Sequence, residues 1–349
     1  MSLGPLMIDI EGQELTAADR EVLRHPLIGG VILFSRNYSD PRQLAALCDA
    51  IHALRDPPLL ITVDHEGGRV QRFRARFSHL PPARLYGSLY DKEPAASLQF
   101  TEQMGWLMAA ELRAVGVDMS FAPVVDMDFG ASGVIGDRAF HRDPNAVGEL
   151  ARAWVLGMRR AGMAACAKHF PGHGAVTGDS HQMLPVDGRA LDEMRQIDEQ
   201  PYVRLIRLDL QAVMMAHVVY EKVDANPASF SRHWIESELR GKLNFKGAVF
   251  CDDLSMQGAA AMGDYPARAR AAMAAGCDML PICNNRTGVE SILDNLEIGR
   301  QPLSQWRLTR LHGDIQSSWG ELLSSHAWRD AQHELRRYHE PEKFTLTGD

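Results

Sequence analysis

Eight short apolar runs, each followed by a stretch with helical periodicity, constrain the fold of this 349-residue chain more than any other feature. Runs of this length and composition are typical of buried strands, and parallel neighbours need a crossover helix between them. The pattern therefore predicts repeated βα units. The runs cover residues 5–10, 29–34, 59–64, 119–126, 162–167, 212–219, 247–252 and 277–283.

Eight βα units are the number that closes a (β/α)8 barrel of the TIM type. We therefore predict an α/β fold with a catalytic barrel over residues 1–302. Residues 303–349 are expected to form C-terminal helices packed on the barrel and a polar tail. A doubly wound open sheet is the alternative, but no G-x-G-x-x-G motif follows an early strand.

Composition excludes several classes of partner. The chain is 45% hydrophobic and 23% charged, which is enough for a full core, and its net charge is −8. Nucleic acid and anionic membranes are therefore not expected partners. No apolar run is long enough to span a membrane, and the first residues lack the features of a signal peptide. Five cysteines without a paired framework indicate free thiols, with Cys166, Cys251 and Cys277 buried, in a reducing cytoplasm.

The densest group of ionisable residues lies in 168–181, KHFPGHGAVTGDSH, directly after the fifth apolar run. Its proline and glycines predict a loop. A polar loop that leaves a buried strand is the usual location of an α/β active site. The ionisable residues are Lys168, His169, His173, Asp179 and His181.

Polar residues also recur where the other apolar runs end. In a barrel the carboxyl ends of all strands meet at one mouth, so these residues predict a single site. They are Asp9, Asp64, Asp126, Lys168, His217, Asp252 and Asn284.

Two further clusters could carry chemistry, and the first of them suits a sugar. In residues 63–73, VDHEGGRVQRF, Asp64 precedes Arg69 and Arg72; a carboxylate and a guanidinium can bind vicinal hydroxyls, although an ordinary surface ion pair explains the spacing equally well. In residues 250–256, FCDDLSM, two acids follow an apolar run. Burying a carboxylate at the end of a strand costs free energy unless the carboxylate is paired or takes part in function. Asp253 is better placed than Asp252 to cap a helix.

The order of these motifs resembles the glycoside hydrolase family 3 β-N-acetylglucosaminidases, which share KHFPGHG, DSH, VDxEGGRVQRF, GDR and DDLSM. The likeness covers about residues 6–295 and is strongest to the single-domain, cytoplasmic type that acts in peptidoglycan recycling in Gram-negative bacteria. It implies retaining hydrolysis of a terminal β-linked N-acetylglucosamine from 1,6-anhydro-N-acetylmuramic acid peptides. We also expect a small-molecule substrate, no cofactor and no metal. Nothing in the sequence suggests an obligate interface between copies, so we expect a monomer.

The resemblance places the catalytic nucleophile at Asp252 and the acid/base at His181, with Asp179 as its partner. A histidine can serve both steps near pH 7 if a carboxylate fixes its tautomer and stabilises its charged form. This sequence departs from the commoner family residues at His65, Met215 and Cys251, none of which is a charged catalytic group. The sugar-binding positions of the family match Asp64, Arg72, Arg138, Lys168 and His169.

Three other interpretations remain open on the sequence. Lys168 at a strand end also suits a Schiff-base aldolase. A non-catalytic sugar-binding barrel would use the same arginines without Asp252. A metal-dependent hydrolase would use a ligand set made of His169, His173, Asp179 and His181, although the first strand carries no His-x-His pair.

Overall fold

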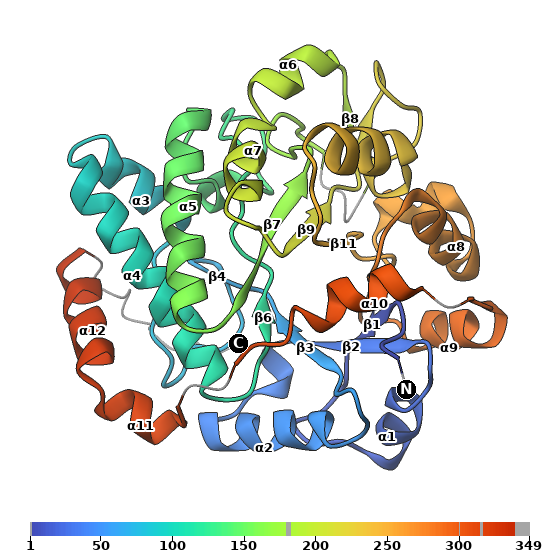
Figure 1. Ribbon diagram of the computed structural model, residues 1–349, viewed down its shortest axis with the longest axis horizontal. Coiled ribbons are helices and arrows are strands. Elements are labelled where there is room, and N and C mark those ends of the chain that lie inside the picture. The colour runs from blue at the N-terminus through green and yellow to red at the C-terminus, as the bar shows by residue number, and fades with distance from the viewer. Residues whose placement is uncertain (1, 179–182, 300, 315–316, 339–349) are drawn as a thin grey trace, which may run out of the picture.

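Eight parallel strands form the centre of the molecule (Figure 1), in the order β11-β9-β7-β6-β3-β2-β1-β12. The computed structural model describes residues 2–178, 183–299, 301–314 and 317–338. Between the two ends of the sheet, Phe250 forms a parallel bridge with Met279, and the Cys251 amide donates to the Met279 carbonyl at 3.0 Å. These contacts close the sheet, so the predicted (β/α)8 barrel is confirmed. The strands are β1 (Leu6–Ile8), β2 (Ile28–Leu33), β3 (Leu60–Val63), β6 (Met119–Ser120), β7 (Ala164–Phe170), β9 (Ala212–Met215), β11 (Ala248–Phe250) and β12 (Leu280–Ile282).

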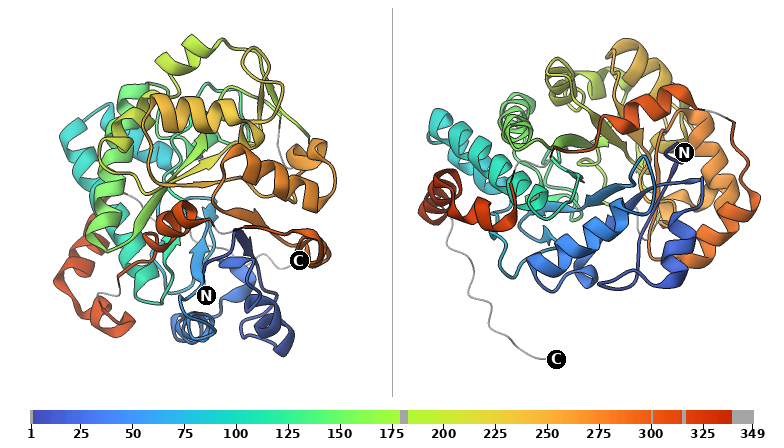
Figure 2. Two further views of the ribbon diagram at one scale, coloured as in Figure 1. Left: turned by 45° about the vertical axis from the view of Figure 1, so that its right-hand side comes forward. Right: turned by 60° about the horizontal axis from the view of Figure 1, so that its bottom comes forward.

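Helices surround the strands on the outside (Figure 2), and several of them begin at a capping side chain. The Asp40 side chain accepts from the Arg42 and Gln43 amides, with Pro41 as the first helical residue. Asp143 and Asp264 cap two further helices in the same way. The main helices are α1 (Ala17–Leu23), α2 (Pro41–His52), α3 (Ala83–Tyr90), α4 (Pro94–Arg113), α5 (Pro144–Arg160), α6 (Leu191–Gln196), α7 (Gln200–Ile206), η4 (His233–Lys242), α8 (Tyr265–Ala275), α9 (Arg286–Asn295), α10 (Pro302–Thr309), α11 (Trp319–Ser324) and α12 (His326–Tyr338).

Short elements lie in the loops that join the strands to the helices. They are the strands β4 (His65–Gly67), β5 (Val70–Gln71), β8 (Val186–Asp187) and β10 (Val219–Tyr220), and the single-turn or short helices η1 (Ser35–Asn37), η2 (Gly136–Arg138), η3 (Ala228–Phe230) and η5 (Gln257–Met262).

Alternation along the strands separates two apolar layers. In β1, Met7 belongs to the cluster that fills the barrel interior, whereas Leu6 and Ile8 pack toward the helices. In β2, Ile32 faces inward and its neighbour Leu33 faces outward. The interior is therefore a packed core, and it leaves chemistry to the ends of the strands.

The C-terminal helices contact the barrel at two places. Leu308 and Leu311 join the interior cluster, and the Gln305 side chain hydrogen bonds to the backbone of Leu3. The Trp328 indole donates to the Glu111 carboxylate at 2.8 Å, which ties α12 to α4. These contacts hold the segment at Leu3 and helix α12 against the barrel.

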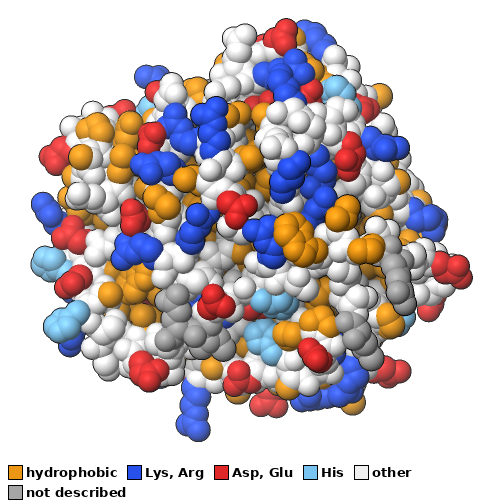
Figure 3. Space-filling view, in the orientation of Figure 1, with side chains coloured by type: hydrophobic (Ala, Val, Ile, Leu, Met, Phe, Trp, Pro, Cys, Tyr) orange, Lys and Arg blue, Asp and Glu red, His pale blue; other side chains and the backbone are white. Residues whose placement is uncertain are grey.

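The surface in Figure 3 mixes Lys and Arg with Asp and Glu across the visible face. All five cysteines are buried and none forms a disulfide. Among the described residues, none of the helices combines the length and the apolar composition that crossing a bilayer requires.

The expected loop after the fifth strand begins later than predicted. Lys168 and His169 belong to β7, which continues to Phe170 because it pairs with Met214 and Met215 of β9. The two polar side chains thus stand on a strand end. Proline and glycine interrupt the ladder only from Pro171 onward.

Candidate active site

One cavity at the carboxyl ends of the strands gathers most of the predicted site residues. Its volume is about 640 Å³. The predicted dyad, Asp179 and His181, lies outside the described residues. The other six, namely Asp64, Arg72, Arg138, Lys168, His169 and Asp252, all line the cavity.

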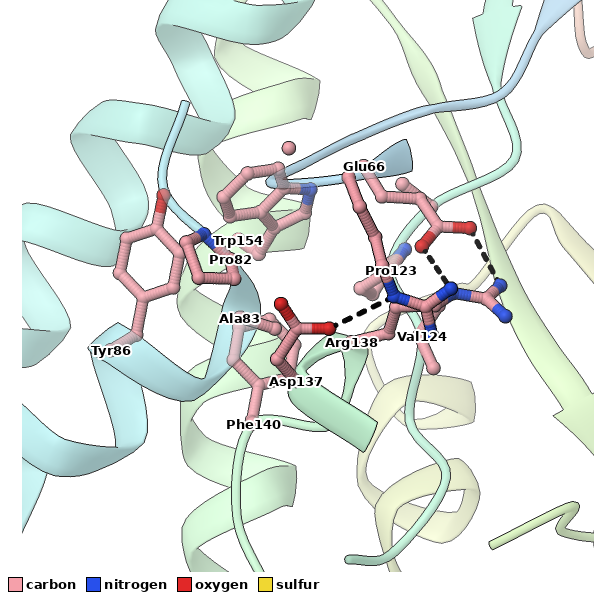
Figure 4. A pocket seen from close by; sticks show the side chains of 13 residues that line it. Glu66, Pro82, Ala83, Tyr86, Pro123, Val124, Asp137, Arg138, Phe140 and Trp154 are labelled. Carbon is pink, nitrogen blue, oxygen red and sulfur yellow. Dashed lines mark hydrogen bonds and ion pairs between the residues drawn. The ribbon is translucent and has the colours of Figure 1, made fainter. Parts of the chain in front are cut away.

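Four charged side chains form a buried network in the cavity wall. Lys168 Nζ lies 2.9 Å from Asp64 Oδ1 and 2.7 Å from Glu66 Oε1. The Arg138 guanidinium donates to both oxygens of Glu66 at 2.8 Å (Figure 4). The side chains of Lys168 and Glu66 are only 3% and 8% exposed. Such a network is a fixed set of charged donors and acceptors, which suits the hydroxyl groups of a sugar.

The charges in the network support one another. Burial alone would raise the pKa of the Glu66 carboxyl, but Arg138 and Lys168 lower it to about 2. Burial likewise opposes the ionisation of Asp64, and Lys168 and Arg72 more than offset it, so its pKa is well below the usual range. The neighbouring acids raise the pKa of Lys168 despite its burial. The amine therefore stays protonated, which argues against the Schiff-base interpretation.

The two arginines of the 63–73 cluster have different roles. Arg72 Nη2 lies 3.3 Å from Asp64 Oδ2, and its guanidinium stands over the Phe34 ring in the cavity wall. Arg69 donates to Asp137 and to the carbonyls of Gly133 and Val134, so it mainly holds the loop before η2.

His169 is oriented by a buried carboxylate. Its Nδ1 lies 2.8 Å from Asp126 Oδ2, and Asp126 Oδ1 accepts from the His173 amide at 2.7 Å. Burial would raise the pKa of Asp126, but His169 and His173 hold it below its usual value. Because Nδ1 is bound to Asp126, Nε2 of His169 is directed away from it.

Asp252 and Asp253 follow β11, but their carboxylates are bound differently. Asp252 Oδ1 accepts from the Asp253 amide at 2.9 Å, and the side chain lines the cavity. Asp253 accepts from the Ser255 amide, the Ser255 hydroxyl and the Cys283 amide. The Asp253 carboxylate, which also borders the cavity, is thus held by Ser255 of its own loop and by Cys283 after β12, and burial raises its pKa to about 6.

His217, at the end of β9, supports this loop. Its Nε2 lies 3.0 Å from the Asp253 carbonyl oxygen, which can only accept, so Nε2 carries the proton. The ring stacks on Phe230 with centroids 5.3 Å apart and is fully buried, and burial lowers its pKa. A neutral imidazole therefore holds the backbone next to Asp252.

Both ends of the segment that contains the predicted dyad are anchored. The Tyr220 hydroxyl donates to the Gly172 carbonyl at 2.8 Å on one side. On the other side, the Arg189 guanidinium binds Asp187 of β8 and Asp198, which joins the end of the segment to the α6–α7 turn. These contacts fix where the segment leaves and rejoins the barrel.

The ligand set of the metal interpretation is not assembled among the described residues, where no three His, Cys, Asp or Glu side chains form a cluster suited to a metal ion. His169 is bound to Asp126. Asp179 and His181 are not described, so family membership decides between this interpretation and the dyad.

Sequence reasoning gave no role to Glu66 or to the Asp126–His169 pair. Glu66 lies two residues after Asp64, so the alternation of a strand would have placed both on one face. The sequence marks Asp126 only as a polar residue at the end of an apolar run.

Comparison with known proteins identifies the family. Residues 6–311 match the glycosyl hydrolase family 3 N terminal domain. The chain belongs to glycosyl hydrolase family 3. It is 54% identical over 332 residues to the β-hexosaminidase of Thioalkalivibrio sulfidiphilus, an alignment that covers 95% of each chain. It is 51% identical over 337 residues to the β-hexosaminidase of Methylobacillus flagellatus, which covers 97% of this chain and 96% of the relative.

A solved structure agrees over nearly the whole chain. NagZ from Neisseria gonorrhoeae, in complex with N-trifluoroacetyl-D-glucosamine, superposes with a TM-score of 0.93 at 41% identity and covers 97% of this chain and 99% of its own. The family resemblance predicted from the motifs is therefore confirmed. The chain is an enzyme, a glycoside hydrolase, and a metal-dependent or aldolase mechanism is not favoured.

Proposed function

We propose that this enzyme is a retaining exo-β-N-acetylglucosaminidase that removes terminal N-acetylglucosamine from peptidoglycan fragments. Its substrate would be N-acetylglucosaminyl-1,6-anhydro-N-acetylmuramic acid that carries a peptide. One observation carries the proposal: the Asp252 carboxylate shares a cavity with the buried Asp64–Lys168–Glu66–Arg138 network. A nucleophile thus faces a wall of charged groups that suits sugar hydroxyls.

Similarity to other proteins supports the choice of sugar. The relatives with half or more of their residues identical are β-hexosaminidases, and the solved structure from Neisseria gonorrhoeae contains an N-acylated glucosamine. The network is nearly buried, which supports exo cleavage because a longer chain would have to continue through it. The peptide-bearing aglycone is what the motif resemblance implies.

The proposed reaction has two steps. An Asp252 oxygen forms a bond to the anomeric carbon while the glycosidic C–O bond breaks, and His181 gives its proton to the leaving oxygen. Water then attacks the anomeric carbon, His181 takes a proton from it, and the bond to Asp252 breaks. Asp179 would stabilise the imidazolium form of His181, which is present before the first step and again after the second.

Trapping the intermediate tests this mechanism. A 5-fluoro N-acetylglucosaminyl donor should label Asp252, which peptide mass spectrometry would locate. A chromogenic β-N-acetylglucosaminide should be hydrolysed much faster than the matching glucoside, and a chelator should leave turnover unchanged. Label on Asp253, or activity lost to the chelator and restored by zinc, would contradict the proposal.

We also propose that the enzyme acts in the cytoplasm as a monomer on a soluble muropeptide, without nucleic acid or membrane insertion. The mixed surface charge and the free buried cysteines support this proposal. Light scattering of the purified protein and fractionation of the source cells would test it.

A further inference from the structure

A buried carboxylate lies next to His169 but outside the wall of the catalytic cavity. The Asp126 side chain has no exposed surface and does not line the cavity. Its segment runs beside β7, where Val124 forms a parallel bridge with Lys168 and the Val125 amide donates to the Lys168 carbonyl at 2.9 Å. Asp126 therefore cannot contact a substrate, and any effect that it has on the reaction must pass through a neighbour.

The two oxygens of the Asp126 carboxylate receive different donors. Oδ1 accepts from the His173 amide at 2.7 Å, and Oδ2 lies 2.8 Å from His169 Nδ1. The His169 amide lies 3.3 Å from both oxygens. Beyond His173, a Cβ atom at Gly174 would collide with the Met127 carbonyl oxygen, so the two backbone segments are in close contact. The carboxylate is thus held in one orientation by a backbone that has little room to shift.

This orientation decides which nitrogen of His169 carries a proton. An ionised carboxylate can only accept, and the two histidines hold the pKa of Asp126 below its usual value. Nδ1 must therefore donate, and in a neutral imidazole, which has one N–H, Nε2 is left as an acceptor. Nε2 has no hydrogen-bond partner among the described residues, and it is not one of their enclosed polar atoms. Because His169 lines the cavity, a ligand can reach Nε2.

An acceptor at this point complements the donor that precedes it in the chain. Lys168 uses two of its three N–H groups on Asp64 and Glu66, which leaves the third for a ligand oxygen. A sugar hydroxyl that accepts from Lys168 still has its own hydrogen to donate. Nε2 of His169 can accept that hydrogen, or the hydrogen of a neighbouring hydroxyl. The two side chains together therefore match the donor and acceptor character of sugar hydroxyls.

We propose that Asp126 is a positioning residue, which keeps the His169 proton on Nδ1 so that Nε2 accepts a hydrogen bond from a hydroxyl of the terminal sugar. The inference rests on the proposed function, because the bound sugar supplies the hydroxyl. The position of the proton is nevertheless a property of the free enzyme, so it can be measured without substrate.

Asp126→Asn separates the charge of this residue from its shape. The amide oxygen of the variant side chain stays with the His173 amide, because an NH2 group there would face another donor. The NH2 group is then directed at His169 Nδ1. Nδ1 must accept from it, so the proton moves to Nε2. The variant thereby presents a donor to the cavity in place of an acceptor while the shape of the site is kept.

Imidazole nitrogen NMR of the ligand-free enzyme at about pH 8 tests the position of the proton. The signals of His169 are identified by their absence from the spectrum of His169→Gln. We expect a protonated Nδ1 in the wild type and a protonated Nε2 in Asp126→Asn. The same tautomer in both enzymes would overturn the proposal. A proton on Nε2 of the wild type, alone or together with one on Nδ1, would overturn it as well.

Kinetics on an aryl N-acetylglucosaminide test whether the tautomer matters to the sugar. We expect Asp126→Asn to lower kcat/KM about tenfold, as for the loss of one hydrogen bond to the substrate. In the His169→Gln background the same replacement should change kcat/KM by less than about twofold, because the residue through which Asp126 acts is absent. Equal factors in the two backgrounds would show that Asp126 only supports the fold.

Asp118→Asn is the matched control. Asp118 is also buried, accepts from the Ile61 amide at 2.9 Å and lies 3.0 Å from His52 Nε2, but it precedes β6 and does not line the cavity. Its kcat/KM should stay near that of the wild type, and a tenfold loss there too would overturn the specific role of Asp126. Thermal unfolding would show whether each variant is folded. Failure of the wild type on the aryl substrate would instead refute the proposed function and leave the NMR result in place.

Discussion

Asp252 and Asp253 are neighbours in sequence, but the Asp253 carboxylate accepts from three donors, two at Ser255 and one at Cys283. We expect Asp252→Ala to lower kcat at least about a thousandfold, because the nucleophile is lost. Its stability should be unchanged or raised, because a like charge beside Asp253 is removed. Asp253→Ala should instead lower the free energy of unfolding by about 1–3 kcal/mol, because buried donors lose their acceptor. Steady-state kinetics and urea unfolding would separate the two residues, and an Asp253 variant that loses more turnover than the Asp252 variant would reverse the assignment.

His181 and Asp179 can be tested through the leaving group. An activated aryl leaving group needs little protonation, so His181→Ala should spare the first step with that substrate and stall the second, in which water must be deprotonated. The covalent intermediate should then accumulate, seen as a burst before a slow steady state. With the natural-type disaccharide both steps should slow. Asp179→Asn should show the same pattern, and the double variant should be far from additive because the two residues share one function. Equal losses on both substrates would mean that His181 only positions the sugar.

At the scale of the elements, the order of the strands and the polar residues near their ends were predictable, but the bounds of the strands and the contacts between them were not. Apolar runs that end in polar residues predicted the barrel and brought Asp64, Lys168 and Asp252 to one mouth. The extension of β7 through His169 depends on its pairing with β9, and the closure at Phe250 and Met279 depends on register between distant segments. Local composition contains neither kind of information, since register is set by the packing of the whole sheet.

The hydrogen bond from His217 joins the end of β9 to the loop that carries Asp252, so its loss should affect catalysis more than binding. We expect His217→Leu to lower kcat about tenfold with little change in KM, as for one lost hydrogen bond at a positioned loop. His217→Gln should recover much of that loss, because its amide can donate to the same carbonyl. His65, another buried histidine, lies outside the cavity lining, and its replacement by glutamine serves as the control. Equal losses in the leucine and glutamine variants of His217 would exclude the hydrogen bond as the cause.

At the scale of the whole molecule, the buried network joins segments after three different strands. Lys168 stands on β7, Asp64 and Glu66 follow β3, and Arg138 lies in η2 after β6. Removal of one partner would leave a buried charge unpaired. That loss strongly destabilises the folded protein, even where the intact ion pair adds little to its free energy of unfolding. The same side chains that suit a sugar therefore also make the mouth of the barrel rigid.

The charge of Glu66 should appear in the pH dependence of global stability. Its pKa is about 2 in the folded protein and 4.5 in the reference state, so its stabilising effect is fully present above pH 4.5 and is lost as the pH falls toward 2. Glu66→Gln should lower the free energy of unfolding by about 3 kcal/mol at pH 7, because Arg138 and Lys168 lose a charged partner. The difference between wild type and variant should narrow as the pH falls from 4.5 toward 2, since the wild-type carboxylate is then protonated as well. Urea unfolding at pH 7, 5, 4 and 3 would measure this difference in the free energy of unfolding. Glu14 is exposed, so Glu14→Gln serves as a control whose stability should equal that of the wild type at each pH. A difference that stays constant or widens in acid would show that Glu66 stabilises the fold through its shape and packing and not through its charge.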